Sequence, residues 1–214
     1  KFGVGGVNFR SPVKSGRYVD TLAFGAYKRD VFTKIGGYDE ELIRNQDDEF
    51  NWRLIQNSGS IWLDPSIKSK YHSRTSILLF FKQYFQYGFY KVRVMQKRKG
   101  LSSIRHFIPA IFILSLMITL FIFFISENIY FLNILVSMYL ITNFISTIIL
   151  FLKSVINNRL NNLESFLLLP FTFITIHMSY GLGFLTGLVY YSNRWNKIHI
   201  NDNCFNKKEL IINS

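Results

Sequence analysis

The chain has 214 residues, a formal net charge of +12 and one cysteine, Cys204, so a disulfide framework and a cysteine-based metal cluster are excluded. Residues 1–65 carry nine basic and nine acidic residues, residues 66–105 carry ten basic residues and no acid, and residues 106–214 carry six and four. Because the basic block directly precedes long apolar runs, it is typical of a cytoplasmic membrane flank and makes nucleic-acid binding the weaker interpretation. No signal-peptide pattern is visible, and we expect Lys1 to be a cut end.

Residues 1–74 carry mixed helix and strand signals. Gly36 and Gly37 end a first helical pattern, and Gly59 follows a second. We therefore predict an α/β fold, which at this size is small for a free-standing domain and indicates half of a larger one. In chain order, the predicted elements are a strand or buried turn at 19–27, a helix at 28–35, a helix at 49–57 and a short strand at 60–63.

Four residues, Gln46, Asp47, Asp48 and Glu49, form the densest acidic cluster at the start of the second predicted helix. Carboxylates in a first helical turn are stabilised by the helix dipole by roughly 0.3–1 kcal/mol, which is a purely structural explanation. In the functional alternative, one carboxylate takes a proton from a hydroxyl nucleophile while its neighbours cap the helix or bind the substrate. Arg53, one turn later, either pairs on the same helix face or points toward a phosphate.

Residues 75–105 alternate aromatic and basic side chains at helical spacing before the first apolar run. This pattern predicts a basic amphipathic helix that lies in the membrane interface. The alternative is an ordinary amphipathic helix packed on its own domain. The two interpretations are compatible, because such a helix can join a polar domain to the bilayer.

Three long stretches without charge follow, and a hydrocarbon core of about 30 Å needs about 20 apolar residues per helix. Buried core helices of a soluble protein are the alternative, but the chain supplies too few polar residues to cover them. The last run is longer than one crossing requires, and Pro170, His177 and its glycines could kink it or pack it closely against a neighbour. The predicted transmembrane helices are at residues 107–125, 129–152 and 165–191.

Charge asymmetry predicts the orientation of the multi-pass segment at residues 106–193. Six basic residues between 91 and 105 precede the first span, whereas the turn after it carries only Glu127. The amino-terminal part is therefore predicted to face the cytoplasm from the cell membrane. The polar tail at 194–214 conflicts with three simple crossings, because its basic residues would then lie outside. Either the charge bias is weak there, or the final run does not cross once in the simple way.

Several sequence motifs carry a resemblance to a known family. The run FTKIGGYDE at residues 32–40, followed by QDDEF at 46–50 and by Arg53, is similar to the GG-aromatic-DE and ED-x-(D/E)-L-x-x-R signature of family 2 glycosyltransferases. YHSRTS at residues 71–76 and QYFQYG at 83–88 extend the resemblance to the membrane-bound, ExoA-type transferases of succinoglycan and other exopolysaccharides. The resemblance covers nearly all of residues 1–192.

The resemblance implies the second half of a GT-A domain, which supplies the acceptor site and the base, while the half with the metal-binding DxD motif is not in this sequence. Asp47 aligns with the family's base, and Gln46 stands where the family usually has an acid. His72 is expected to complete a Mg²⁺ or Mn²⁺ site, and Arg74 is expected to lie near the diphosphate. Gln83 begins a QxxRW-like motif whose Arg and Trp are replaced, which favours transfer of a single sugar. The expected substrate-binding residues are Gly25, Gln46, Asp48, Glu49, Arg53, Arg74 and Gln83.

These inferences favour an inverting enzyme that moves a sugar from a nucleotide-sugar donor to a hydroxyl of a lipid-linked or oligosaccharide acceptor at the bilayer. This piece alone is expected to be inactive. The alternative is a non-catalytic membrane scaffold, or a degenerate remnant that lacks the donor-binding domain. A transporter or channel is disfavoured, because polar pathways in such proteins carry charged residues that the apolar runs lack.

Overall fold

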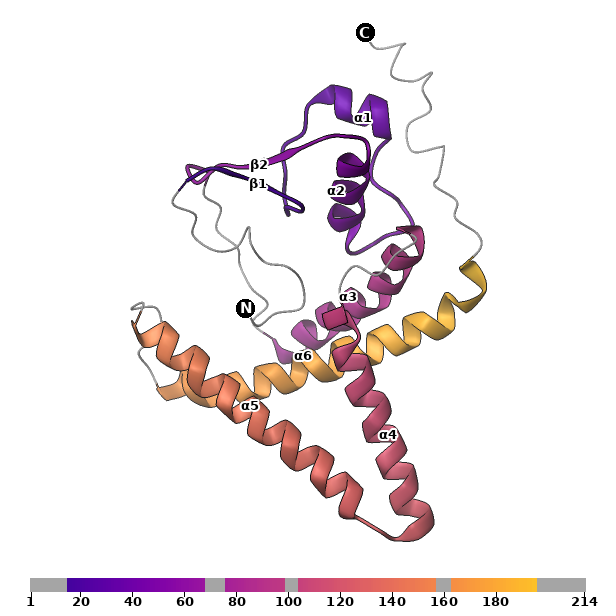
Figure 1. The fold of residues 1–214 in the computed structure, drawn as a ribbon, viewed down its shortest axis with the longest axis vertical. Coiled ribbons are helices and arrows are strands. Elements are labelled where there is room, and N and C mark those ends of the chain that lie inside the picture. The colour runs from indigo at the N-terminus through magenta and orange to yellow at the C-terminus, as the bar shows by residue number, and fades with distance from the viewer. Residues whose placement is uncertain (1–14, 68–75, 99–103, 157–162, 196–214) are drawn as a thin grey trace.

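A computed structural model describes residues 15–67, 76–98, 104–156 and 163–195 (Figure 1). The described chain is mostly helical, with a small polar domain, one long helix beside it and three long apolar helices. The elements in chain order are β1 (Arg17–Val19), α1 (Arg29–Ile35), α2 (Gln46–Gln56), β2 (Ile61–Leu63), α3 (Ile77–Lys97), the 3₁₀ turn η2 (Ile104–His106), α4 (Ile108–Ser126), α5 (Tyr130–Ile156), α6 (Leu163–Tyr190) and the 3₁₀ turn η3 (Ser192–Arg194).

The polar domain, residues 15–67, forms its small core around Phe50 of α2, which is completely buried. The rings of Tyr27, Phe32 and Tyr38 pack against it, with centroids 4.9, 5.4 and 4.7 Å away. Aromatic pairs of this kind contribute about 0.5–1.5 kcal/mol beyond the area they bury. Ring contacts therefore hold α1 and its flanking turns on α2.

The helices predicted in this domain are present, the strand predicted at 60–63 is β2, and the strand or turn predicted at 19–27 contains only the last residue of β1. The helix predicted at 28–35 is α1, whereas the helix predicted at 49–57 begins earlier, because Asn45 with a left-handed φ of 61° starts α2 at Gln46. β1 and β2 pair antiparallel, with Tyr18 opposite Trp62, and the chain from residue 20 to 28 is turn rather than strand. Among the described residues the strands are limited to this pair, so the α/β GT-A architecture stays a prediction.

Helix α3 has two halves with different surroundings. Its first turn exposes Ile77 and Leu78, which are 68% and 73% accessible, whereas residues 91–97 are all buried. The structure thus has a helix where the sequence predicts the basic amphipathic one, but its basic half packs against its own protein. The first half alone keeps an apolar surface of the kind that fits a membrane interface.

Helices α3 and α6 cross in close contact at glycines (Figure 1). A side chain on Gly88 of α3 would collide with the Tyr180 carbonyl and lie 2.9 Å from the Phe184 nitrogen. One on Gly183 of α6 would lie 2.8 Å from the Phe85 carbonyl carbon and closer still to its oxygen. The obstructing atoms are backbone on both sides, so the helices touch main chain to main chain, as small residues allow in membrane helix pairs.

Helices α4, α5 and α6 are each long and apolar enough to cross a membrane, by length and composition. The three predicted apolar helices are therefore confirmed. Many of their large hydrophobic side chains are exposed, including Phe121 and Phe124 on α4 and Ile141 and Phe144 on α5. Exposure of such surface to water is unfavourable by about 25 cal/mol per Å², whereas lipid chains cover it without that penalty.

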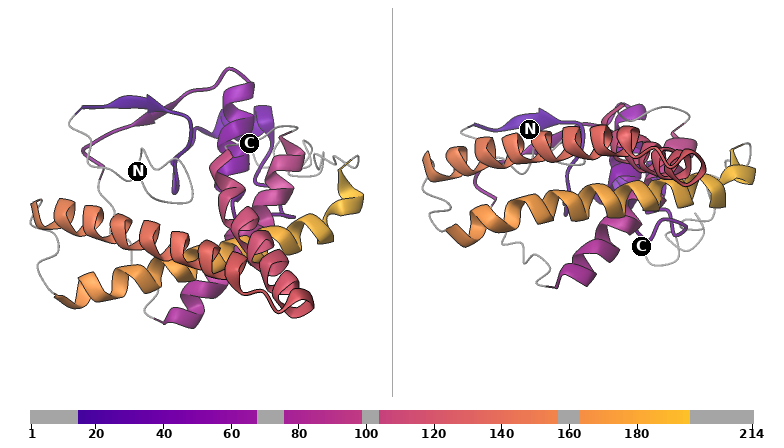
Figure 2. Two further views of the ribbon diagram at one scale, coloured as in Figure 1. Left: turned by 60° about the horizontal axis from the view of Figure 1, so that its bottom comes forward. Right: turned by 90° about the horizontal axis from the view of Figure 1, so that it is seen from below.

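Helix α4 runs away from the polar domain and α5 returns, whereas α6 runs across this hairpin toward α3 (Figures 1 and 2). α4 and α5 contact through the stacked rings of Phe112 and Tyr139, whose centroids are 4.3 Å apart. α5 and α6 contact where Tyr139 Oη lies 3.0 Å from His177 Nδ1. Asn143 Nδ2 also donates to the Pro170 carbonyl over 3.2 Å. These polar side chains therefore bind one another between helices.

Candidate functional site

The turn before α2 is anchored on α3. The side-chain nitrogen of Asn45 donates to the Tyr87 carbonyl over 3.0 Å, and Arg44 Nε donates to Gln86 Oε1 over 3.0 Å. The left-handed backbone of Asn45 is one that asparagine adopts more readily than most residues. The first turn of α2, with its acidic cluster, is therefore held against the middle of α3.

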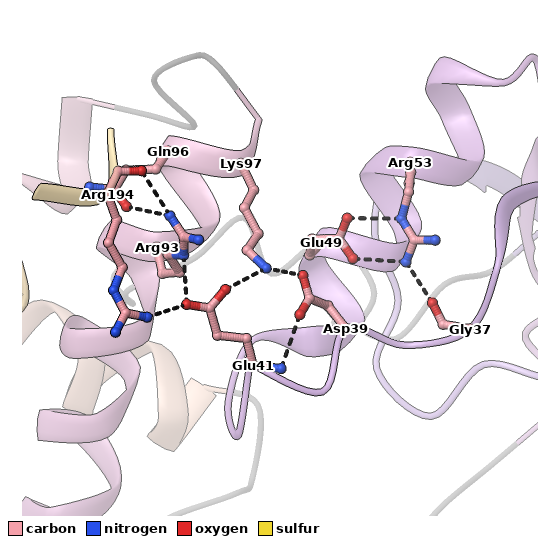
Figure 3. Close-up of polar contacts among 9 residues, drawn as sticks. All are labelled: Gly37, Asp39, Glu41, Glu49, Arg53, Arg93, Gln96, Lys97 and Arg194. Atoms are coloured by element: carbon pink, nitrogen blue, oxygen red, sulfur yellow. Dashed lines mark hydrogen bonds and ion pairs between the residues drawn. The ribbon is translucent and has the colours of Figure 1, made fainter. Parts of the chain in front are cut away.

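The carboxylate of Glu49 is held by Arg53, one turn later in α2 (Figure 3). Arg53 Nε and Nη2 each lie 2.9 Å from one oxygen of Glu49. The same guanidinium donates to the Gly37 carbonyl over 2.7 Å and also to the Ile35 carbonyl. The bidentate pair fixes the guanidinium, and its bonds to the two carbonyls tie the end of α1 to α2. The geometry matches the pairing alternative, and a role of either residue in binding substrate stays a prediction.

Asp48 joins α2 to two cations of α3. Its carboxylate oxygens lie 2.6 Å from Lys91 Nζ and 2.9 Å from Arg98 Nη2, and Arg98 also donates to the Asp48 carbonyl. Burial alone would raise the pKa of Asp48, but Lys91 and Arg98 outweigh burial and lower the pKa below its ordinary value. Asp48 is therefore ionised and paired at neutral pH, which makes it a poor acceptor for a further proton.

Asp47 lies half-buried next to Asp48 in the same first turn. Its Oδ1 accepts a hydrogen bond from the Asp48 backbone nitrogen over 2.9 Å. Burial lowers the pKa of Lys91, and the charges of Asp48 and Asp47 oppose that shift, so Asp47 acts on the same cation. Gln46, which precedes it, is exposed. Asp47 is thus a partly accessible carboxylate, and its role as a base stays a prediction.

The loop after β1 packs on α2 through Asn51, a buried residue that the sequence analysis misses. Asn51 Nδ2 donates to the Leu22 carbonyl over 2.7 Å and to Thr21 Oγ1 over 3.2 Å. Tyr27 Oη donates to Asn51 Oδ1 over 2.6 Å, and because burial raises the pKa of Tyr27, its hydroxyl keeps its proton. Gly25 lies within the loop that these bonds hold.

A second ion cluster joins the turn after α1 to α3 and to the end of α6 (Figure 3). The Glu41 carboxylate lies 3.0 Å from Arg93 Nε, 2.8 Å from Lys97 Nζ and 2.8 Å from Arg194 Nη1, and Lys97 also pairs with Asp39. The side chains of Arg93 and Lys97 are only 3% and 4% exposed. Burial alone would raise the pKa of Glu41, but Lys97 and Arg93 lower it below its ordinary value.

These ion pairs change the interpretation of the basic block. Lys91, Arg93, Lys97 and Arg98 are predicted to be a membrane flank, but the structure pairs each of them with a carboxylate of the polar domain. The physical reason is that a cation taken into a protein interior needs a counter-charge. Residues 39–49 supply six acids to a block that has none of its own, and this imbalance is the sequence signal for the pairing.

The remaining predicted residues lie on α3 or outside the described part of the chain. Gln83 Nε2 donates to Tyr87 Oη over 2.8 Å, and the carbonyl of the same Tyr87 accepts the hydrogen bond that anchors Asn45. His72 and Arg74 fall at residues that the structure does not describe. Within the described ranges, no group of three or more His, Cys, Asp or Glu side chains could hold a metal ion. The Mg²⁺ or Mn²⁺ site therefore stays a prediction.

Comparison with known proteins finds a curated transferase. Over 180 residues the chain is 27% identical to the dolichyl N-acetyl-alpha-D-glucosaminyl phosphate 3-beta-D-2,3-diacetamido-2,3-dideoxy-beta-D-glucuronosyltransferase of Methanococcus voltae. The match covers 82% of this chain and 49% of that protein, so the chain spans about half the length of this relative. No model of a protein family matches the chain, and no solved structure matches it. The chain is thus similar to part of a glycosyltransferase.

Proposed function

We propose that this chain is the acceptor-side half of an inverting family 2 glycosyltransferase with a GT-A catalytic domain. The observation that carries the transferase part of the proposal is the similarity to the Methanococcus voltae protein, whose name gives a glucuronosyl-type sugar as the transferred group and a dolichyl-linked N-acetylglucosaminyl phosphate as the acceptor. The family 2 and GT-A assignments and the inversion rest on the sequence resemblance at residues 32–53. Because the chain spans about half of that protein, the reaction belongs to the whole enzyme. The donor is a nucleotide sugar, and the acceptor is a hydroxyl of a lipid-linked saccharide used in cell-surface polysaccharide synthesis.

Asp47 is the proposed catalytic base. The acceptor oxygen forms a bond to the anomeric carbon from the face opposite the nucleotide, while the bond from that carbon to the diphosphate oxygen breaks. Asp47 takes the proton of the hydroxyl, and the nucleoside diphosphate leaves with the electron pair of the broken bond. Asp48 and Glu49 are each held in a charge-assisted pair, and Asp47 is chosen as the base because it aligns with the aspartate of the family's ED pair.

The leaving diphosphate needs positive charge, which Mg²⁺ or Mn²⁺ and basic side chains supply in such reactions. We assign His72 as a ligand of this metal and Arg74 as a contact of the diphosphate, with the other ligands in the donor-binding half. Gly25, Gln46 and Gln83 are assigned to the path of the substrate.

A lipid-linked acceptor fits the position of α2 relative to the apolar helices. Asp48 pairs with Lys91, and the next residue, Val92, belongs to the buried cluster that joins α3 to Tyr180 and Phe184 of α6. The acidic turn is therefore linked to α6, a helix long and apolar enough to cross a membrane, through the ion pair with α3 and the packing of α3 on α6. This closeness allows a sugar on a membrane lipid to reach Asp47 while its lipid stays in the bilayer. The site is proposed to face the cytoplasm from the cell membrane.

The test uses the full-length protein in membranes, with radiolabelled UDP- and GDP-sugars as donors and extracted dolichyl- and polyprenyl-linked glycolipids as acceptors. Asp47→Asn is expected to lower transfer by at least about 100-fold, because a positioned base contributes roughly 10²–10⁴-fold. Asp30→Asn is the matched control, since Asp30 is also in a first helical turn but is exposed on α1, and it should keep wild-type activity. Full transfer by Asp47→Asn would remove Asp47 as the base. No transfer by the wild type across the panel would favour the scaffold.

A further inference from the structure

Helix α4 begins on the polar domain's side of the molecule. Arg98, shortly before η2, pairs with Asp48 of the polar domain. His106 of η2 lies against the α3–α6 crossing, where its Nδ1 is 3.1 Å from Tyr180 Oη. α4 then runs away from the polar domain, and the α4–α5 turn at Glu127 lies at the opposite end of the molecule from α1 (Figure 1).

The end of α6 is bound to the polar domain and to the buried half of α3 (Figure 3). The Tyr191 carbonyl accepts a hydrogen bond from Gln96 Nε2 over 2.9 Å. The Arg194 carbonyl accepts from Arg93 Nη1 over 3.1 Å, and the Arg194 side chain lies 2.8 Å from Glu41. Main-chain and side-chain contacts of Tyr191 and η3 thus place the chain directly after α6 on the same side as the start of α4.

These positions decide the number of crossings. When α4 crosses outward and α5 crosses back, α6 starts on the polar domain's side, and its end is bound there as well. A third crossing would carry Arg194 to the far surface of a hydrocarbon core about 30 Å thick, which is incompatible with its ion pair to Glu41. We propose that the chain crosses the membrane twice and that α6 lies in the interface of the leaflet on the polar domain's side, with its apolar face against lipid and α3 packed across it.

Helix α6 is the least apolar of the three long helices. Charges mark both ends, Glu164 in the first turn and Arg194 just after the last. Tyr190 ends the helix and Tyr191 and Trp195 follow it, and tyrosine and tryptophan side chains favour the headgroup region of a bilayer. The exposed apolar side chains are Leu167, Leu168, Phe171, Val189 and Tyr190, with Trp195 just beyond.

The distribution of positive charge supports two crossings independently of the contacts. None of the 25 Lys and Arg residues falls between residues 106 and 152, which contain α4, the turn and most of α5. With two crossings, every basic residue of the chain lies on one side and only the turn with Glu127 lies on the other. With three crossings, the four basic residues from Arg194 onward would lie opposite all the rest. The two-crossing arrangement therefore removes the charge conflict.

Cysteine labelling of the full-length protein tests this topology in sealed right-side-out and inverted membrane vesicles, with a membrane-impermeant maleimide as the probe. With any cysteine outside this sequence replaced by serine, native Cys204 reports the tail. With Cys204→Ser added to that background, the exposed positions Gln56→Cys, Asn128→Cys and Asn193→Cys report the polar domain, the α4–α5 turn and the end of α6. We expect Cys204 and Asn193→Cys to label from the same side as Gln56→Cys, and Asn128→Cys to label from the opposite side.

Two results would overturn the proposal. Labelling of Asn193→Cys together with Asn128→Cys would show that α6 crosses, and labelling of all positions from one side would show that the α4–α5 hairpin does not. Leu168→Cys tests the placement of α6 in the interface, because Leu168 is 62% exposed and belongs to the proposed lipid-facing surface. It should stay unlabelled from either side until detergent is added, and rapid labelling in intact vesicles would remove α6 from the interface.

Discussion

Replacing Gly183 by alanine tests whether α3 and α6 touch main chain to main chain. On an isolated helix this change is stabilising by about 1 kcal/mol, because alanine is a better helix former than glycine. In the crossing, the new methyl group would lie 2.8 Å from the Phe85 carbonyl carbon and closer to its oxygen, and neither atom can move without its helix. Overpacking costs about 1–3 kcal/mol, and a clash with main-chain atoms belongs at the upper end of that range. After subtraction of the gain in helix propensity, we expect a net loss of roughly 2 kcal/mol.

The measurement is the thermal unfolding of the detergent-purified full-length protein. At about 2–4 °C per kcal/mol for a domain of this size, Gly183→Ala should lower Tm by several degrees. Thr186→Ala on the same helix is the matched control, since it also improves helix propensity but Thr186 is exposed and bonds only within α6. Its Tm should equal or slightly exceed that of the wild type. A Gly183→Ala variant as stable as the wild type would refute the close crossing.

Two further predictions concern the ion pairs of the polar domain. Arg53→Lys should lower the free energy of unfolding by about 1–3 kcal/mol, because one ammonium cannot bind the buried Glu49 carboxylate and two carbonyls together. Chemical denaturation measures this loss, with Arg29→Lys at an exposed position as the control. An effect no larger than that of the control would contradict the prediction. Burial would raise the pKa values of Asp48 and Glu41, but their cations lower both. These ion pairs therefore stabilise the folded protein above the unfolded-state pKa values of about 3.9 and 4.3, and this stabilisation is lost as pH falls through the lower folded-state pKa values. Tm should hold between pH 7 and about pH 5 and fall below about pH 4, and a Tm that stays constant to pH 2 would argue against these pairs.

Local patterns account for the parts of the fold that follow from the sequence. α4 and α5 arise from apolar runs long enough to span the hydrocarbon core of a bilayer, and α1 ends where Gly36 takes a left-handed φ of 79°. The placement of α6 depends on a partner far away in the sequence. Its glycines predict close packing, but nothing local indicates that Gly88 of α3 is the surface they meet.

The acidic turn at the start of α2 and the choice of Asp47 within it follow from the sequence and its resemblance, whereas the ion pairs of Asp48 do not. The pair of Glu49 with Arg53 follows from helical spacing. The pairs of Asp48 with Lys91 of α3 and with Arg98 just after it join segments more than 40 residues apart in the sequence. Asn51 gives no signal at all, because an asparagine within a helix is expected at the surface, yet it is buried and orders the loop after β1.

The burial of the basic half of α3 also determines what kind of force retains the protein at the bilayer. A lysine or arginine that faces anionic lipid contributes about 1 kcal/mol of attraction, which added salt screens. Here Lys91, Arg93, Lys97 and Arg98 face carboxylates of the same molecule instead. These four cations therefore contribute little to retention, and the exposed apolar surface of the long helices supplies a force that is insensitive to ionic strength. The buried half of α3 uses its positive charge to join parts of the same molecule.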